Sequence, residues 1–386
     1  ISVSERRSQM LDFRAGVSTA QGIRGGFEYG YRNLFGKGIG LTLRVQLANQ
    51  FLFFDNVLAE RIRALSLADR LERRITLGVQ LPYLPRMPNT RVSLSVSHLR
   101  DNQRAFGLDS NNVDLTFTVR PVRQFILTLS GGLENNDVDL LTDEDTYQEL
   151  LMNAPPGLRA LLRVPQGRST LVSGEVGATL DLRDNPFTPT EGFYASVKAE
   201  WARTLSAEAV EVAGMTERFF SHHVRTELTI SGYVPVGPLT LALQGRVGRV
   251  FHLQDRSKTY PNRQFFLGGV DTVRGYLQDS MVPQDLADEG ITSAQISQGG
   301  DVFMVARAEL RFPIRGMVYG GAFTDFGNLW ARAGNLNPLE LRPTAGLGLR
   351  FATPVGPVAF DYGFLLARRR ELGERIGSFH FSIGLF

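Results

Sequence analysis

The sequence predicts an all-β fold, a transmembrane antiparallel β-barrel of about sixteen strands. Two observations lead to this fold class. No stretch approaches the roughly 18 consecutive apolar residues that a membrane-spanning helix needs. Apolar and polar residues instead alternate with a period of two along most of the chain, as they do in β-strands. With sixteen strands, 386 residues leave about 24 for each strand and its connection, which suits the roughly 10-residue strands of outer-membrane barrels.

The polar face of these strands separates a membrane barrel from a soluble β-sandwich or propeller. In a soluble sheet the apolar face points toward the core and the polar face meets water. Positions rich in Arg, Glu, Asp and Gln are too numerous here for a filled interior, but they suit the wall of a watery lumen inside a lipid-facing belt. The membrane barrel is therefore favoured over a soluble all-β array.

The predicted strands follow one another along the whole chain, each with apolar residues at every second position. In the first half the alternating segments are residues 11–17, 27–31, 41–47, 75–81, 92–96, 113–119 and 125–129. In the second half they are residues 193–201, 224–230, 239–243, 302–312, 319–329, 344–351, 358–364 and 379–385.

Long and short connections are predicted to alternate between these strands. Proline and glycine clusters predict compact turns at residues 84–88, 121–122, 184–192 and 235–238. Charged or partly helical patterns predict long surface loops at residues 55–74 and 135–168, and the longest connection spans residues 252–300. We expect the loops on the cell-exterior side, opposite the turns, to include residues 55–70, 135–167, 202–216 and 335–341.

The longest connection contains a stretch, residues 265–276, that resembles neither a strand nor an ordinary surface loop. Its glycines permit a tight backbone, and its arginine carries five donors that can bind carboxylates where the loop is buried. We interpret it as a structured plug, and the alternative is a glycine turn beside a surface arginine. The residues that define it are Gly268, Gly269, Val273, Arg274, Gly275 and Tyr276.

Composition and spacing argue against several other functions. A net charge of +3 is too small to indicate nucleic-acid binding, and no cysteine is present. None of the five histidines has the spacing of a metal motif, and no nucleophile or acid-base set is clustered, so we expect no metal, no cofactor and no enzymatic activity. The histidines are His98, His222, His223, His252 and His380.

The glycine–arginine stretch and several other segments of the chain resemble motifs of the BamA/TamA superfamily of outer-membrane barrel-assembly insertases. This superfamily also includes two-partner-secretion transporters. The most specific match is the stretch from Gly268 to Tyr276, which resembles the family's signature loop between strands eleven and twelve. The resemblance implies a sixteen-stranded barrel with this loop folded into the lumen and Arg274 paired with Glu309 and Asp325. Supporting matches are residues 33–38, 184–186, 189–192, 323–327 and 379–386.

The resemblance covers nearly the whole chain, so we expect residues 1–386 to form one outer-membrane barrel domain. Family members carry soluble periplasmic polypeptide-transport-associated (POTRA) domains before the barrel, and nothing before Leu11 is long enough to form one. We therefore expect this chain to be the barrel portion of a longer protein, and the alternative is a naturally short relative. No charged and apolar signal segment opens the sequence at Ile1.

The function that the resemblance implies is assembly and insertion of β-barrel proteins through a weak seam between the first and last strands. The last strand is short and glycine-bearing, so its pairing could open and offer an edge to an incoming strand; the alternative is a plain closed barrel. The residues expected at this lateral seam are Leu11, Phe13, Ala15 and Val17 on the first strand and Gly377, Phe379, Phe381, Ile383 and Gly384 on the last.

The implied partners are unfolded outer-membrane protein substrates, the lipid bilayer and lipopolysaccharide, in the outer membrane of a Gram-negative bacterium. Accessory lipoproteins or an inner-membrane partner would bind through the periplasmic domains. The competing function is a two-partner-secretion type transporter that exports a polypeptide through the lumen. A passive porin is disfavoured by the anchored loop.

Overall fold

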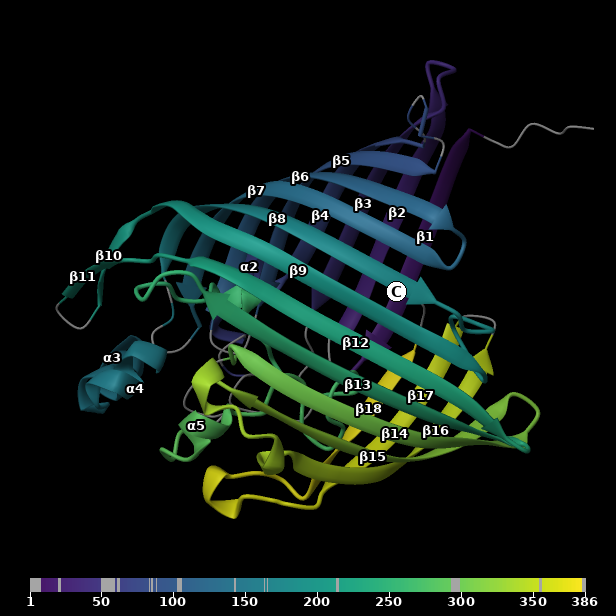
Figure 1. The fold of residues 1–386 in the computed structure, drawn as a ribbon. Coiled ribbons are helices and arrows are strands. Elements are labelled where there is room, and N and C mark those ends of the chain that lie inside the picture. Colours follow the sequence, from purple (N-terminus) through teal and green to yellow (C-terminus); the bar gives the residue numbers. More distant parts are fainter. Residues whose placement is uncertain are drawn as a thin grey trace, which may run out of the picture.

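The computed structural model describes residues 8–19, 22–49, 60, 63–82, 84, 86–87, 89–102, 106–141, 144–162, 164, 166–212, 215–292, 299–353 and 356–383. Within these ranges, sixteen antiparallel strands close into a single barrel, with β1 paired to both β2 and β18 (Figure 1). The predicted fold class is confirmed. No helix in the described part of the chain has the length and apolar character needed to cross a membrane.

The barrel strands run in chain order around the wall. They are β1 (Gln9–Ser18), β2 (Gly22–Leu34), β3 (Ile39–Asn49), β4 (Glu72–Leu81), β5 (Thr90–Asn102), β6 (Phe106–Val122), β7 (Phe125–Leu140), β8 (Gly167–Asp181), β9 (Gly192–Ala207), β12 (His222–Val236), β13 (Leu239–His252), β14 (Val302–Arg315), β15 (Val318–Trp330), β16 (Arg342–Thr353), β17 (Gly356–Leu365) and β18 (Gly377–Ile383). A separate hairpin, β10 (Ala209–Val212) and β11 (Met215–Arg218), lies between β9 and β12 in the sequence.

The wall has an apolar outer face and a polar inner face, because successive side chains of a strand point to opposite sides. On β4, Ile75, Leu77 and Val79 are 40%, 47% and 38% exposed, which is unusual for apolar side chains in a protein surrounded by water. On β16, Leu347 and Leu349 are likewise exposed, whereas Arg350 binds the buried Asp361 of β17 at 2.6 Å. The exposed apolar belt is the surface expected to face lipid.

One end of the barrel carries tight turns and the other carries the longer connections (Figure 1). The long end holds α3 (Glu144–Asn153) and α4 (Pro156–Leu162), the β10–β11 hairpin, and α5 (Gln284–Ala287). Shorter helical turns at this end are α2 (Leu67–Arg70), η1 (Pro261–Arg263), η2 (Ala333–Asn335), η3 (Pro338–Glu340) and η4 (Arg370–Leu372).

Three predicted loop boundaries are wrong, because strands continue into regions that are polar on both faces. The loop predicted at 135–168 begins only after β7 ends at Leu140, and the loop predicted at 202–216 contains the end of β9 and most of the hairpin. Beyond the lipid belt, both faces of a strand can meet water, so alternation no longer marks it. Residues 55–59, 61 and 62 of the loop predicted at 55–74 lie outside the described residues, and its last three residues belong to β4.

One strand, β8, was absent from the alternating segments identified in the sequence. Its register pairs it with β7 from Gly167 to Leu180 and with β9 from Ser169 to Asp181. Serine, threonine and glycine occupy many of its positions, including Ser173, Gly174 and Gly177, and these small residues hide the apolar period. The expected number of strands was nevertheless right.

Two apolar clusters lie within the barrel and at its long end, and the connection between β13 and β14 contributes to both. One cluster joins Val250, Phe303 and Val305 of the wall to Phe265 and Leu267 of that connection. The other joins the ends of β6, β7 and β8 to α3, α4 and the connection; its members include Phe106, Leu108, Val138, Tyr147, Leu151, Leu162, Leu171, Tyr260 and Leu286. Internal packing therefore centres on this connection.

Candidate functional site

The connection between β13 and β14, described at residues 253–292 and 299–301, is called the lumen loop here because it packs against the inner face of the wall. Phe265 packs against Phe303 of β14, with the two rings tilted by 53° and their centroids 4.7 Å apart. Leu267 and Val273 are buried, and a methyl group added at Gly327 of β15 would lie 2.4 Å from the Val273 side chain. The loop thus fits closely against β14 and β15.

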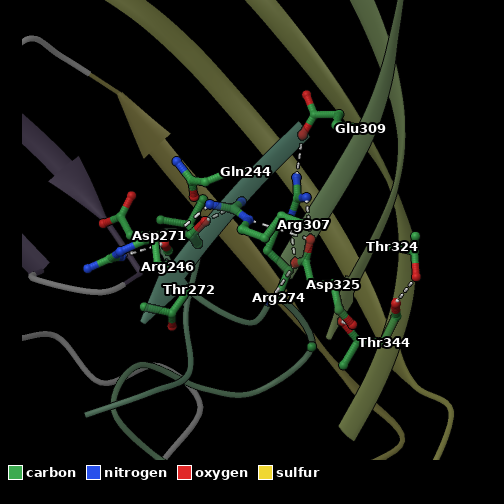
Figure 2. A network of polar contacts seen from close by, with 12 residues as sticks. Gln244, Arg246, Asp271, Thr272, Arg274, Arg307, Glu309, Thr324, Asp325 and Thr344 are labelled. Carbon is green, nitrogen blue, oxygen red and sulfur yellow. Dashed lines mark hydrogen bonds and ion pairs between the residues drawn. The ribbon is translucent and has the colours of Figure 1, made fainter. Parts of the chain in front are cut away.

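Arg274 lies at the centre of a buried ion cluster on this wall (Figure 2). Its Nε and Nη2 atoms donate to the two carboxylate oxygens of Asp325 at 2.8 and 2.7 Å, and its Nη1 donates to Glu309 at 2.5 Å. The Arg274 backbone N–H also donates to Asp325, at 3.0 Å. Its guanidinium carbon lies 3.5 Å from the ring centroid of Phe323, a cation–π contact. The structure therefore brings together the three residues that the resemblance implied.

The charge at this cluster is shared among several strands. Glu309 also accepts hydrogen bonds from Arg311 at 3.0 Å and Arg350 at 3.4 Å. Arg307 of β14 reaches the loop backbone and donates to the Val270 and Asp271 carbonyl oxygens at 2.9 and 3.2 Å. A buried carboxylate is costly unless it is paired and hydrogen-bonded, and these arginines provide the pairing.

Gly275 brings the loop backbone against the last two strands. Its φ of 106° is one that side chains other than glycine rarely adopt. A methyl group added at Gly363 of β17 would lie 2.6 Å from the Gly275 nitrogen, so both positions need glycine for this approach. The Gly275 N–H donates to Nε2 of His380 on β18 at 3.3 Å, so the loop contacts the strand that closes the barrel.

The other predicted loop residues shape the same stretch. The Gly268 carbonyl accepts the Thr272 hydroxyl at 2.9 Å, and the Gly269 N–H donates to the Tyr276 carbonyl at 3.1 Å. Tyr276 is buried, with the Arg342 guanidinium 5.0 Å from its ring centroid. These local bonds fold residues 268–276 into a compact unit.

A second buried arginine, Arg263, was not singled out in the sequence. It lies in η1 and binds Glu134 of β7 with both Nη atoms, at 3.1 and 2.7 Å, and Glu200 of β9 with Nε at 2.8 Å. Burial alone would lower the pKa of the Arg263 guanidinium, but the hydrogen bonds and charges of Glu134 and Glu200 outweigh it, and the pKa is raised. Its position eleven residues before Arg274, in the same long connection, is the signal that could have identified it.

The first and last strands meet over a short length. Among the described residues, the ladder between β1 and β18 pairs only Val17 with Ile383 and Ser18 with Ser382. Thr19 adds a backbone hydrogen bond to the Phe381 carbonyl at 2.9 Å. By comparison, β1 pairs with β2 along its whole length, from Gln9 to Ser18.

In this register, only some of the residues expected at the seam pair between β1 and β18. Val17 and Ile383 are direct partners, and Phe381 lies opposite Thr19. Gly377 and Phe379 are paired with β17 and lie beyond the described seam. Leu11, Phe13 and Ala15 are paired with β2, and Leu11 and Phe13 are 54% and 76% exposed. Gly384 lies outside the described residues.

No group of three His, Asp or Glu side chains in the described ranges has an arrangement that could hold a metal ion. The polar clusters of the lumen instead pair arginines with carboxylates, which is the chemistry of structural anchoring.

Comparison with known proteins identifies relatives in bacteria and in eukaryotes. The chain is 28% identical over 244 residues to the outer membrane protein assembly factor BamA of Neisseria meningitidis, covering 55% of this chain and 28% of that protein. It is 32% identical over 136 residues to the chloroplastic outer envelope protein 80 of Arabidopsis thaliana, covering 33% and 15%. A SAM50-like protein of Schizosaccharomyces pombe is 25% identical over 304 residues, covering 75% and 58%. The matched segments thus amount to less than two thirds of each relative's length.

Solved structures share the fold. BamA from Haemophilus ducreyi lacking POTRA domains 1–3 superimposes with a TM-score of 0.71 at 16% identity, over 98% of this chain and 70% of that one. CdiB from Escherichia coli gives a TM-score of 0.57 at 14% identity, over 99% and 63%. Residues 33–386 also match the profile of the Omp85 superfamily domain. The chain therefore belongs to the Omp85 superfamily, as a BamA-like barrel.

Proposed function

We propose that this chain is the barrel of an outer-membrane assembly factor, which folds and inserts β-barrel proteins through the seam between β1 and β18. The observation that carries the proposal is the short seam, two register pairs among the described residues, in a wall whose other ladders are long. The BamA relatives, whose names state that they are outer membrane protein assembly factors, support it. Its site is the outer membrane of a Gram-negative bacterium.

The physical reason lies in the cost of an open strand edge. In lipid, an unpaired backbone N–H or C=O group costs several kcal/mol, so a barrel normally keeps all its strands paired. A seam with few ladder bonds has the lowest cost of opening in the wall. Once open, β1 would offer an edge of unpaired backbone groups to a strand of an unfolded substrate, which can bind by β-augmentation. No catalytic residue and no cofactor take part.

The proposal extends to partners that the relatives imply. Unfolded outer-membrane proteins are the substrates, and the surrounding lipid and lipopolysaccharide receive the product. Residues 1–386 would act as the barrel domain of a larger protein, with periplasmic domains that deliver substrate and bind accessory lipoproteins or an inner-membrane partner. The lumen loop, with Arg274 held by Glu309 and Asp325, would position β14 to β18 relative to the seam.

A disulfide across the seam tests this mechanism. Ser18 and Ser382 are direct partners in the ladder, and residues opposite one another in an antiparallel pair are about 4.5–5.5 Å apart, within disulfide reach. Because the chain has no cysteine, Ser18→Cys with Ser382→Cys forms one defined bond. Oxidation should stop assembly of outer-membrane proteins in cells, and reduction should restore it.

The matched control is Ser196→Cys with Thr229→Cys, which joins β9 to β12 in the middle of a long ladder. That bond should leave assembly unchanged. The competing function, export of a polypeptide through the lumen as in two-partner secretion, requires no opening of the seam. A locked seam that still supports outer-membrane assembly would contradict lateral opening and favour the transporter.

A further inference from the structure

The lumen loop carries two arginine clusters, and they bind separate sectors of the wall. Arg263 binds Glu134 on β7 and Glu200 on β9. Arg274 binds Glu309 on β14 and Asp325 on β15. Strands β12 and β13, which lead into the loop, lie between these sectors in the barrel order. The loop is therefore fixed to the wall on both sides of β12 and β13, the strands that precede it.

Further contacts extend each limb of the loop along the wall. Next to Arg263, the Tyr260 hydroxyl accepts a hydrogen bond from Ser169 of β8 at 2.8 Å. Asn262 donates to Glu134 at 3.1 Å. Beyond Arg274, the loop reaches β18 through the Gly275 N–H and His380. The loop thus connects the inner faces of strands from β7 to the closing strand.

The two clusters differ in how well water reaches them. The side chains of Arg274, Asp325 and Glu309 are 1%, 0% and 9% exposed, and Asp325 also accepts the Arg274 backbone N–H. The side chains of Arg263, Glu134 and Glu200 are 9%, 12% and 16% exposed. Water can replace protein partners more readily at the Arg263 cluster, so that cluster should release first when the loop moves.

We propose that Arg263 is a latch, a positioning residue that holds the first limb of the lumen loop (residues 260–264) against β7 to β9, while Arg274 is the fixed anchor of the second limb. Opening of the latch lets the first limb leave the wall without disturbing the Arg274 cluster. The proposal concerns the position of the loop and holds for an insertase and for a transporter alike.

Two serines lie under the two limbs and provide matched reporters. Ser169 is 5% exposed beneath Tyr260. Ser378 of β18 is also 5% exposed and lines a cavity of about 160 Å³ with Gly275 and Tyr276. Because the chain has no cysteine, Ser169→Cys or Ser378→Cys introduces one thiol of nearly the same size. Modification by a water-soluble maleimide then measures how often each limb leaves the wall.

The experiment compares arginine variants of the purified barrel in each reporter background. Arg263→Ala should raise the labelling rate of Ser169→Cys by about tenfold or more and leave Ser378→Cys protected. Arg263→Lys keeps the positive charge but loses the planar guanidinium with its several N–H donors, so it should raise the labelling rate of Ser169→Cys by less. Arg44→Ala is the control, because it removes an arginine paired with Glu28 on β2, away from the loop; it should change neither rate.

Two outcomes would overturn the proposal. If Arg263→Ala leaves Ser169→Cys as protected as in the parent, the first limb is held by other contacts. If Arg263→Ala exposes both reporters equally in a barrel that keeps its heat-modifiable band on a gel, the loop moves as one unit and has no separate latch. Should Arg263→Ala fail to fold, Glu200→Gln removes one carboxylate of the cluster and is judged by the same two rates.

Discussion

At the residue scale, Arg274 shows how a full charge is kept inside the barrel wall. Its guanidinium donates to both oxygens of Asp325 and to Glu309, and Phe323 covers its face. Removing one partner from a buried ion cluster leaves the other charges without compensation, which typically costs about 3–5 kcal/mol. We therefore expect Arg274→Ala to lower the free energy of unfolding by roughly 3 kcal/mol or more, measured by urea titration of the folded barrel.

A matched variant also removes the two negative charges that Arg274→Ala leaves without their partner. Arg274→Ala combined with Glu309→Gln and Asp325→Asn should recover part of the loss, because the buried carboxylates are then neutral. Arg311→Ala, which takes one of the several donors from Glu309, should cost less than about 1 kcal/mol, since its side chain is 36% exposed. An Arg274→Ala barrel as stable as the parent would show that the cluster is solvated in solution.

The two arginines also show what the sequence reveals about the site. Arg274 was identified because it stands in a motif with glycines around it, and its partners Glu309 and Asp325 stand in neighbouring motifs. Arg263 has no such context, and its partners Glu134 and Glu200 lie 129 and 63 residues away in sequence. Period-two alternation indicates that Glu200 faces the lumen, but it does not show which loop residue Glu200 meets. Glu134 lies beyond the alternating segment at 125–129.

At the element scale, the turn between β8 and β9 is organised by one carboxylate. Asp184 accepts the Thr190 hydroxyl at 2.6 Å, the Thr190 N–H at 3.0 Å and the Glu191 N–H at 3.2 Å. These hydrogen bonds favour the ionised form, so the pKa of Asp184 is lowered from 3.8 to about 2. The turn is therefore fully stabilised above pH 4 and loses this support as the pH falls toward 2.

This titration predicts that the turn loosens in acid. Pepsin, which is active in this range, should cut near the exposed Phe187 faster as the pH is lowered from 4 to 2. Asp184→Asn keeps one acceptor oxygen but does not titrate, so its cleavage rate provides the baseline at each pH. The prediction fails if the ratio of the two rates stays constant, because then protonation of Asp184 does not weaken the turn.

The strands themselves could be predicted more completely than their ends. Alternation is enforced where one face meets lipid and the other the lumen, as on β4 and β16. It disappears beyond the belt, where Asn135 and Asn136 of β7 still pair with β8 although both are polar. The seam register was also unpredictable, because the pairing of Val17 with Ile383 depends on how the whole wall closes and not on either strand alone.

At the scale of the whole molecule, antiparallel order places every second connection at the same end of the barrel. Locating one connection on either side of the membrane therefore fixes the orientation of the whole barrel. We expect the long end to face the cell exterior. Gly334 in η2 and Gly316 in the β14–β15 turn are matched insertion sites at opposite ends, because an added Cβ at either meets nothing within 4 Å. An epitope inserted after Gly334 should bind antibody on intact cells, and one after Gly316 only after permeabilisation.

The same orientation decides how the proposed mechanism works. In the proposed mechanism β1 and β18 open toward lipid, and the lumen loop is attached at the exterior end. A substrate arriving from the periplasm then meets the short turns and the seam first. Protease added to intact cells should then cut within residues 141–166 and 208–221, at α3, α4 and the hairpin, and spare the turn at 186–192. The reverse pattern, with an exposed Gly316 epitope, would place the lumen loop on the periplasmic side and make delivery of substrate to the seam from that side untenable.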